Sequence, residues 1–289
     1  MKVSWPDDVD HVDDARRAET PTPTPTPRTA TGLRAGRILG VGLGVVLVVV
    51  ELAWTASVGL SSPELPVNPP VAVVVDGEVP AAARSVEQPS AGRARAGRPL
   101  PTQLADWAGQ LGPQVGVPAV ALAAYGAAEL VLADEQPGCH LSWVAVAGVG
   151  SVESDHGRSA GAVLLPDGRS QPPVVGIALD GNGVAAIGDS DGGRLDGDPV
   201  HDRAVGPMQF IPSTWRRWQA DGDGDGRADP FALPDAALAA ARYLCYSGAG
   251  DLRAAGPWTR AVLAYNASSE YLVEVTRRSN GYAAASVAR

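Results

Sequence analysis

The chain has 289 residues, with 23 Lys and Arg against 32 Asp and Glu, and its net charge is −9. Only Lys2 is a lysine and the arginines form no cluster, which argues against a nucleic-acid-binding protein because phosphate neutralisation needs clustered positive charge. This length allows one large domain or two small ones, and the proline- and glycine-rich stretches favour one folded unit. We expect it to act as a monomer.

Residues 1–37 have a composition that cannot bury a core. Six acidic residues occur before position 20, and TPTPTPTP follows at residues 20–27. Like charges repel, and alternating proline removes backbone donors and favours extended chain. We predict a disordered tail, either simply solvated or used for docking.

Residues 38–60 are uncharged except for Glu51. As a helix they would span roughly 34 Å at ~1.5 Å per residue, enough for the apolar layer of a bilayer. Arg34 and Arg37 precede the segment, and the next basic residue is Arg84. This asymmetry predicts a transmembrane anchor with a cytoplasmic tail and an extracytoplasmic remainder. A cleaved signal peptide is the alternative, and the chain would then be secreted.

Residues 61–102 are rich in Pro, Ala, Gly and Ser without periodicity, which indicates a semi-extended linker. A folded domain is predicted at residues 103–280, followed by a flexible C-terminus at 281–289. Because the domain is exported in either case, Cys139 and Cys245 are expected to form a disulfide, the common state in an oxidising compartment.

The domain is predicted to be mainly α, with a long loop insertion. Apolar spacing and Pro or Gly boundaries predict helices at residues 103–111, 117–134, 143–154, 212–219, 234–246, 258–265 and 268–279. Between residues 155 and 229 there are twelve aspartates and no glutamate, interspersed with glycine, which favours turns. We expect a long insertion that lines a cleft, with a hairpin near residues 173–187.

Glu153 ends a run of ten apolar or small residues. It is either a surface residue beyond a buried helix or a carboxyl group held partly out of water, which would raise its pKa. A protonated carboxylic acid near neutral pH is the proton donor that glycosidic cleavage needs. Asp155 would lie about 200° further round the helix and point elsewhere. Asp189 or Asp202 could still supply a second carboxylate from a distant loop.

DGDGDGRAD places Asp221, Asp223 and Asp225 at alternating positions and Asp229 at the ninth position of a calcium-loop pattern. The twelfth position, normally a bidentate glutamate, is Ala232. The loop therefore either binds calcium weakly, with help from Asp235 or water, or is an Asx-rich turn.

Four motifs in order resemble the soluble domain of lytic murein transglycosylases of the membrane-bound B type, a lysozyme-like family, and are similar to its exported actinobacterial forms. They are VESDHGR at 152–158, AVGPMQFIPSTW at 204–215, ADGDGDGRADPFALPDAALAAARYLC at 220–245 and AVLAYNASSEYLVEV at 261–275. The resemblance covers roughly residues 103–280, and it implies the α+β lysozyme-like form of the mainly α class.

The resemblance implies that Glu153 is a lone catalytic acid and base acting on peptidoglycan glycan strands. Such enzymes cleave the β-1,4 bond between N-acetylmuramic acid and N-acetylglucosamine and leave a 1,6-anhydro end. No organic cofactor is required, and the family can carry a structural calcium ion. A lysozyme-type hydrolase on the same fold and a non-catalytic wall-binding scaffold are the alternatives.

The resemblance also assigns substrate-binding residues: Ser154, Met208, Gln209, Phe210, Tyr265 and Asn266. Gln209 would hydrogen-bond the glycan, with Met208 and Phe210 packing the cleft wall. The alternative is a loop entering a helix, with Met208, Phe210 and Trp215 in the core, and the two interpretations are compatible. Tyr265 and Asn266 would face Glu153, whereas Tyr271 is expected in the core. His156 could line the cleft, without an assigned role in proton transfer.

Overall fold

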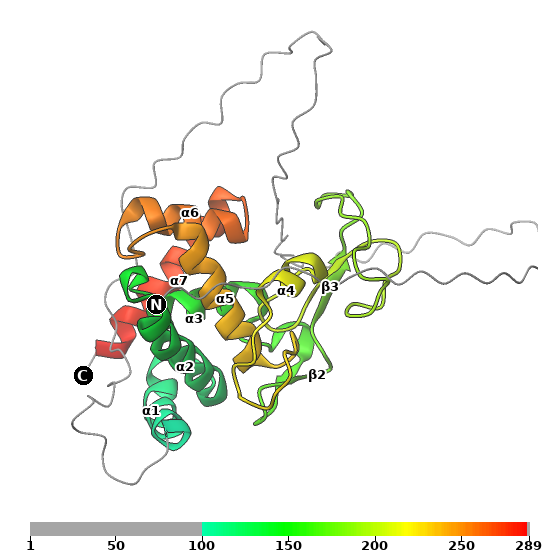
Figure 1. The fold of residues 1–289 in the computed structure, drawn as a ribbon. Coiled ribbons are helices and arrows are strands. Elements are labelled where there is room, and N and C mark those ends of the chain that lie inside the picture. Colours follow the sequence, from blue (N-terminus) through cyan, green and yellow to red (C-terminus); the bar gives the residue numbers. More distant parts are fainter. Residues whose placement is uncertain (1–99, 288–289) are drawn as a thin grey trace, which may run out of the picture. The chain divides into compact units, whose positions relative to one another are not determined.

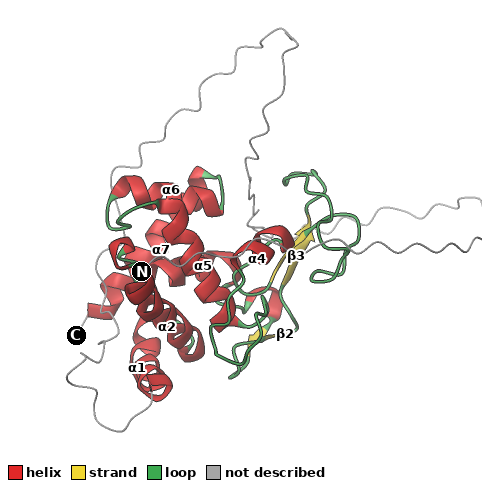
Figure 2. Cartoon of the chain, in the orientation of Figure 1, coloured by secondary structure: helices red, strands yellow, loops and turns green. Residues whose placement is uncertain are grey.

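The computed structural model describes residues 100–287 (Figure 1). The predicted tail, membrane segment and nearly all of the linker lie outside these residues. The described part has seven α-helices: α1 (Leu100–Val115), α2 (Ala119–Glu135), α3 (Trp143–Ser154), α4 (Pro212–Trp218), α5 (Leu233–Gly248), α6 (Ala255–Tyr265) and α7 (Ser269–Val287). The predicted mainly helical class is confirmed (Figure 2).

The positions of the helices agree closely with those predicted from the sequence, and α3 has the predicted bounds. The ends of the domain differ. Helix α1 begins at Leu100, inside the predicted linker, and α7 continues to Val287, where a flexible C-terminus was predicted. Buried Ala283 and Ser286 explain the second difference, because they hold the last turns of α7 against the domain.

Helix α3 is central to the helical part and packs chiefly against α7 and α2. Small residues allow this close approach: a Cβ atom at Gly148 would lie 2.1 Å from Ser279 Oγ on α7. Similarly, a Cβ atom at Gly150 would lie 2.3 Å from the hydroxyl of Tyr125 on α2. The run of apolar and small residues before Glu153 is therefore a helix buried on nearly every side.

A carboxylate holds the start of α3. The backbone N–H of Trp143 donates to Glu129 Oε2 of α2 over 2.7 Å, and Glu129 is buried. The first N–H groups of a helix have no partner inside it, and a negative charge there is favourable because of the helix dipole. This contact fixes the position of α3 relative to α2.

The long middle segment contains four short strands in two antiparallel pairs: β1 (Val163–Leu164) with β2 (Ser170–Gln171), and β3 (Val175–Ala178) with β4 (Arg203–Val205). The predicted hairpin near residues 173–187 was partly wrong. The N–H of Ile187 does donate to the carbonyl of Leu179. The strand that pairs with β3, however, is β4, which lies further along the sequence. In the figures the strands lie beside α4, away from α1 and α2.

Among the described helices, none alone has the length and hydropathy to cross a membrane. The helices over Pro101–Val115 and Ala119–Glu135 meet those criteria only together, and they are bent by 117°.

The predicted disulfide between Cys139 and Cys245 is confirmed, with their Cα atoms 5.5 Å apart. It links the short helical turn Pro137–Cys139, directly before α3, to α5. It therefore closes a loop across 106 positions that contains α3 and all four strands.

We predict that replacing both cysteines with serine lowers the free energy of unfolding, by roughly 4–5 kcal/mol if chain entropy dominates. Urea unfolding of the double variant, compared with the wild type with and without reductant, measures this. Equal midpoints for all three samples would contradict a stabilising role.

Candidate active site

Glu153 lies in the last turn of α3 and is 8% exposed. Its Oε1 accepts a hydrogen bond from the Tyr271 hydroxyl of α7. Its Oε2 is buried and has no hydrogen-bond partner among the described residues. The buried position of the carboxyl group matches the second of the two predicted alternatives.

Burial raises the pKa of the Glu153 carboxyl to about 8, while the hydrogen bond from Tyr271 reduces the rise because it favours the charged form. At neutral pH the group is therefore mostly a carboxylic acid. Its carbonyl oxygen, Oε1, accepts from Tyr271, which leaves Oε2 to carry the proton. A carboxylic acid of this kind can donate a proton to an oxygen placed beside it.

Two stacked tyrosines lie next to this acid. The rings of Tyr265 and Tyr271 are 6.5 Å apart at an interplanar angle of 8°. Burial first, and then the nearby Glu153 carboxyl, raises the pKa of both phenols, so both remain hydrogen-bond donors. Tyr265, however, donates to the carbonyl of Met208 over 2.8 Å, so the direct partner of Glu153 is Tyr271.

Tyr271 was predicted to lie in the core and was not predicted as a site residue. Tyr271 is indeed buried, at 5% exposed, but its hydroxyl is directed at the acid. The sequence feature that could have indicated this contact is the position of Tyr271 in the first turn of α7, shortly after the Tyr265–Asn266 pair. A buried tyrosine needs a partner for its hydroxyl, and a nearby buried carboxyl group is one.

The loop between β4 and α4 connects Glu153 to the rest of the site. Ser154, the neighbour of Glu153, donates its hydroxyl to the carbonyl of Pro207 over 2.6 Å and accepts from Gly157 N–H. Ser154 is 1% exposed, so this hydroxyl is used inside the protein. Tyr265 holds the next residue of the loop, Met208, in the same way.

Gln209 is the residue of this loop that borders open space. Its backbone is left-handed, with φ of 49°, and its side-chain amide donates to the carbonyl of Gly206 over 2.8 Å. Met208 and Phe210, on either side of it, are buried. Both side chains belong to the hydrophobic core, and neither lines the pocket that Gln209 borders.

Gln209 lines a pocket of about 390 Å³. The other walls are mostly aliphatic and come from residues 159–184 and Ala204, and they include Pro173, Val175 and Ile177. No lining residue carries a charge. The predicted insertion thus borders a pocket, and the loop holding Ser154 also holds the pocket residue Gln209.

Asn266 directly follows Tyr265, ends α6 and is fully buried. His156 is also buried, between two tyrosines, with Nδ1 3.0 Å from the Tyr125 hydroxyl and Nε2 2.9 Å from the Tyr282 hydroxyl. The expectation that His156 lines the cleft was therefore wrong.

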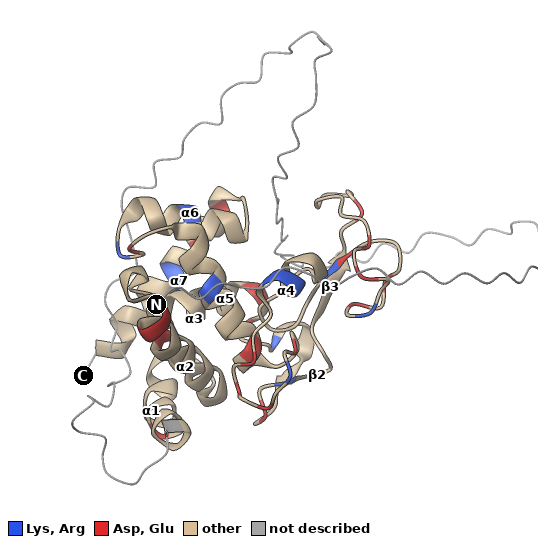
Figure 3. Ribbon diagram, viewed as in Figure 1, with Lys and Arg blue, Asp and Glu red and all other residues tan. Residues whose placement is uncertain are grey.

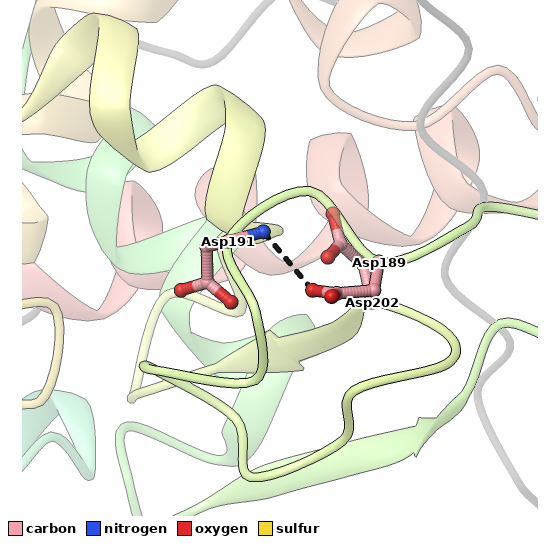
Figure 4. Close-up of side chains that lie close together, drawn as sticks. All are labelled: Asp189, Asp191 and Asp202. Carbon is pink, nitrogen blue, oxygen red and sulfur yellow. Dashed lines mark hydrogen bonds between the residues drawn. The ribbon is translucent and has the colours of Figure 1, made fainter. Parts of the chain in front are cut away.

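The acids considered as partners of Glu153 are directed elsewhere. Asp155 is exposed, and its carboxylate pairs with Arg158 at 3.0 Å. Asp189, Asp191 and Asp202 form a separate group on the loop before β4 (Figure 4). Asp202 accepts from Ser190 and Asp189 accepts from the backbone of residues 191–193. Only burial and Tyr271 shift the pKa of Glu153 appreciably.

Acidic positions are frequent in the loops around β3 and α4 (Figure 3). Within the predicted calcium loop, Asp221, Asp223 and Asp235 each place one carboxylate oxygen within 4.8 Å of the others. Carboxylate oxygens are ligands that calcium prefers, so these three residues fit such an ion. Asp235 also accepts from the N–H groups of residues 222, 223 and 229, which shapes the loop.

The two other predicted ligands lie outside this group. Asp229 pairs with Arg169 at 2.7 Å, and Asp225 accepts from the N–H of Arg227. Asp235 supplies the third carboxylate of the group from the first turn of α5. Ala232, at the twelfth position of the calcium-loop pattern, has no oxygen in its side chain.

Comparison with known families gives one match. A family described as "Transglycosylase SLT domain" matches residues 203–285, which include β4, the loop before α4, helices α4–α6 and most of α7. No curated protein matches the chain. The match supports a transglycosylase-type domain that acts on peptidoglycan. It contains Gln209, Tyr265 and Tyr271, whereas Glu153 lies before it.

We predict that Glu153→Gln becomes more stable than the wild type as the pH rises. Between about pH 4.5 and about pH 8 the folded wild type keeps a proton that the unfolded chain has lost, so its stability falls with pH. The glutamine variant has no such loss, so by pH 7 its unfolding free energy should have gained on the order of 3 kcal/mol relative to the wild type, compared with the difference at acidic pH.

Urea unfolding at several pH values measures this difference. Glu135→Gln, which removes a surface carboxylate paired with Arg242, is the control. If the unfolding free energies of the wild type and Glu153→Gln changed with pH in the same way, this would contradict a buried, protonated Glu153.

Proposed function

We propose that this protein is a lytic murein transglycosylase of the membrane-bound B type, with a domain that cleaves the β-1,4 bond between N-acetylmuramic acid and N-acetylglucosamine. The observation that carries the proposal is the Glu153 carboxyl. It is buried, its pKa is raised to about 8, and one of its oxygens has no hydrogen-bond partner within residues 100–287. The match of residues 203–285 to a transglycosylase domain supports the substrate class.

In the first step Glu153 donates the proton on Oε2 to the glycosidic oxygen, and the bond from that oxygen to C1 of the muramic acid breaks. The positive charge that develops at C1 is stabilised by the substrate's own N-acetyl group. This route suits a site with one acid, since no aspartate contributes appreciably to the pKa of Glu153. Retaining and inverting enzymes with two carboxylates need the second one about 5–9.5 Å away.

In the second step the carboxylate of Glu153 removes the proton from the 6-hydroxyl of the same sugar. The oxygen then attacks C1, which closes the 1,6-anhydro ring and returns the proton to Glu153. Water is not consumed. A base with a pKa near the working pH suits both steps, because it must donate and accept the same proton.

The remaining residues have supporting roles in this proposal. Tyr271 fixes the orientation of Glu153 and leaves Oε2 for the substrate. Gln209 presents its side-chain oxygen to a sugar in the pocket that it lines, while Ser154 and Tyr265 hold the loop that carries it. Asn266 contributes to the position of the sugar or the acid.

We place this activity outside the cytoplasm, on a domain tethered by a transmembrane segment at residues 38–60. The disulfide between Cys139 and Cys245 supports export, because disulfides persist mainly in oxidising compartments. The partners are peptidoglycan glycan strands and, through the anchor, the membrane.

We further propose a structural calcium ion at Asp221, Asp223 and Asp235. These oxygens lie close together, and the ion would offset the repulsion among three carboxylates. Its role would be to hold the loop before α5.

Digestion of purified peptidoglycan followed by mass spectrometry tests the reaction. We predict 1,6-anhydromuramic acid ends for the wild type and at least a hundredfold lower activity for Glu153→Gln, because the amide can neither donate nor accept this proton. Reducing ends would indicate a hydrolase. Binding of glycan without cleavage by the wild type would indicate a scaffold protein.

Thermal unfolding with calcium and with a chelator tests the ion. We predict a higher melting temperature with calcium, and loss of this response in Asp223→Asn. Asp191→Asn, in the separate group of Figure 4, is the control and should keep the response. No response in the wild type, or loss of it only in the control, would contradict the proposed site.

A further inference from the structure

The chain reverses direction immediately after the candidate acid, through three successive left-handed residues. The φ angles are 51° for Asp155, 59° for His156 and 83° for Gly157. The left-handed conformation costs an L-residue with a Cβ atom roughly 1–2 kcal/mol. Two of the three residues have a side chain, so contacts elsewhere in the fold must offset this cost.

Some of the compensation is local. The N–H of His156 donates to the carbonyl of Gly150 over 2.8 Å, and that of Asp155 donates to the carbonyl of Ser151. These bonds satisfy carbonyls at the end of α3 that have no partner within the helix. They explain the turn, but they do not explain why its second residue is a buried histidine.

The His156 ring is held on both sides. Tyr125 of α2 lies at Nδ1 and Tyr282 of α7 lies at Nε2, at 3.0 and 2.9 Å. A neutral imidazole has one donor and one acceptor nitrogen, so one tyrosine accepts and the other donates. Both nitrogens are then satisfied without an added proton.

The ring also remains neutral. Burial, followed by Arg158 and Arg278, lowers the pKa of His156 to about 3. The hydrogen bonds of His156 to Tyr125 and Tyr282 therefore persist over the whole pH range in which Glu153 would act. His156 itself has no proton to offer the substrate, which removes it from the chemistry.

Besides the contact from Tyr125 of α2, helix α7 makes two contacts at the end of α3. Tyr271 binds Glu153 and Tyr282 contacts His156, and the two tyrosines are eleven residues apart, or about 16 Å along the helix. Such a two-point link prevents the end of α3 from rotating or fraying. Rotation there would move the Glu153 carboxyl away from Tyr271 and toward water.

We propose that His156, held by Tyr125 and Tyr282, is a positioning residue that keeps the Glu153 carboxyl buried against Tyr271. The inference rests on the proposed function only for its kinetic consequence. The groups that face Glu153 are Tyr271 of α7 and Tyr265 of α6, and those that face His156 are Tyr125, Tyr282, Arg158 and Arg278.

Tyr282→Phe tests the proposal, since it removes one hydroxyl and keeps the ring. Cleavage by the acid is lost as the pH rises through the pKa of Glu153. A more hydrated Glu153 has a lower pKa, so the alkaline limb of the kcat profile should move to lower pH. We expect kcat to fall roughly tenfold, with KM little changed.

A matched control separates positioning from stability. Thr276→Val removes another buried hydrogen bond of α7, from Trp258 Nε1 at 2.8 Å, outside the site. It should lower the melting temperature without moving the alkaline limb. His156→Gln retains one donor and one acceptor and should keep more activity than His156→Ala. An unchanged limb in Tyr282→Phe, or an equal shift in Thr276→Val, would overturn the proposal.

A measurement that needs no activity keeps the two proposals apart. NMR titration of the Glu153 carboxyl carbon should give a lower pKa in Tyr282→Phe than in the wild type. Equal values would overturn the positioning role even in an active enzyme. A lower value in a protein that cleaves no glycan would support positioning while the proposed function fails.

Discussion

The buried carboxyl group of Glu153 constrains how the helices around it pack. A charged carboxylate in a low-dielectric interior is costly, and the group lowers this cost by keeping its proton. In this chain the cost is reduced further by a single tyrosine hydroxyl on Oε1. The other oxygen, Oε2, is buried and has no hydrogen-bond partner among the described residues, and in the proposed reaction it carries the proton that is donated.

Keeping the carboxyl group in place requires that α3 be fixed at both ends. Glu129 binds the first N–H of the helix, and the contacts of His156 follow its last turn. Between them, Gly148 and Gly150 allow α7 and α2 to approach the helix backbone. The disulfide joins the chain just before α3 to α5. These contacts involve three other helices, α2, α5 and α7, so the position of the acid depends on the packing of several helices together.

Much of this arrangement was predictable from local sequence. Helix α3 has its predicted bounds because the apolar run and its ending at Glu153 are local signals, and the cysteine pair was predicted from the expectation that the domain is exported. The partner of β3 was not predictable, since a strand pair separated by a long loop leaves no periodic signal. Tyr271 and His156 were missed for a similar reason. A sequence shows that a tyrosine is apolar enough to be buried, but only the fold shows which group meets its hydroxyl.

The most direct test of the central claim is the protonation state of Glu153 itself. Infrared difference spectra between the wild type and Glu153→Gln, recorded near pH 6.5 with carboxyl-labelled glutamate, isolate this one group. A pKa of about 8 predicts the carbonyl stretch of a protonated carboxylic acid in the wild type. A spectrum with only the carboxylate stretches at this pH would contradict the account.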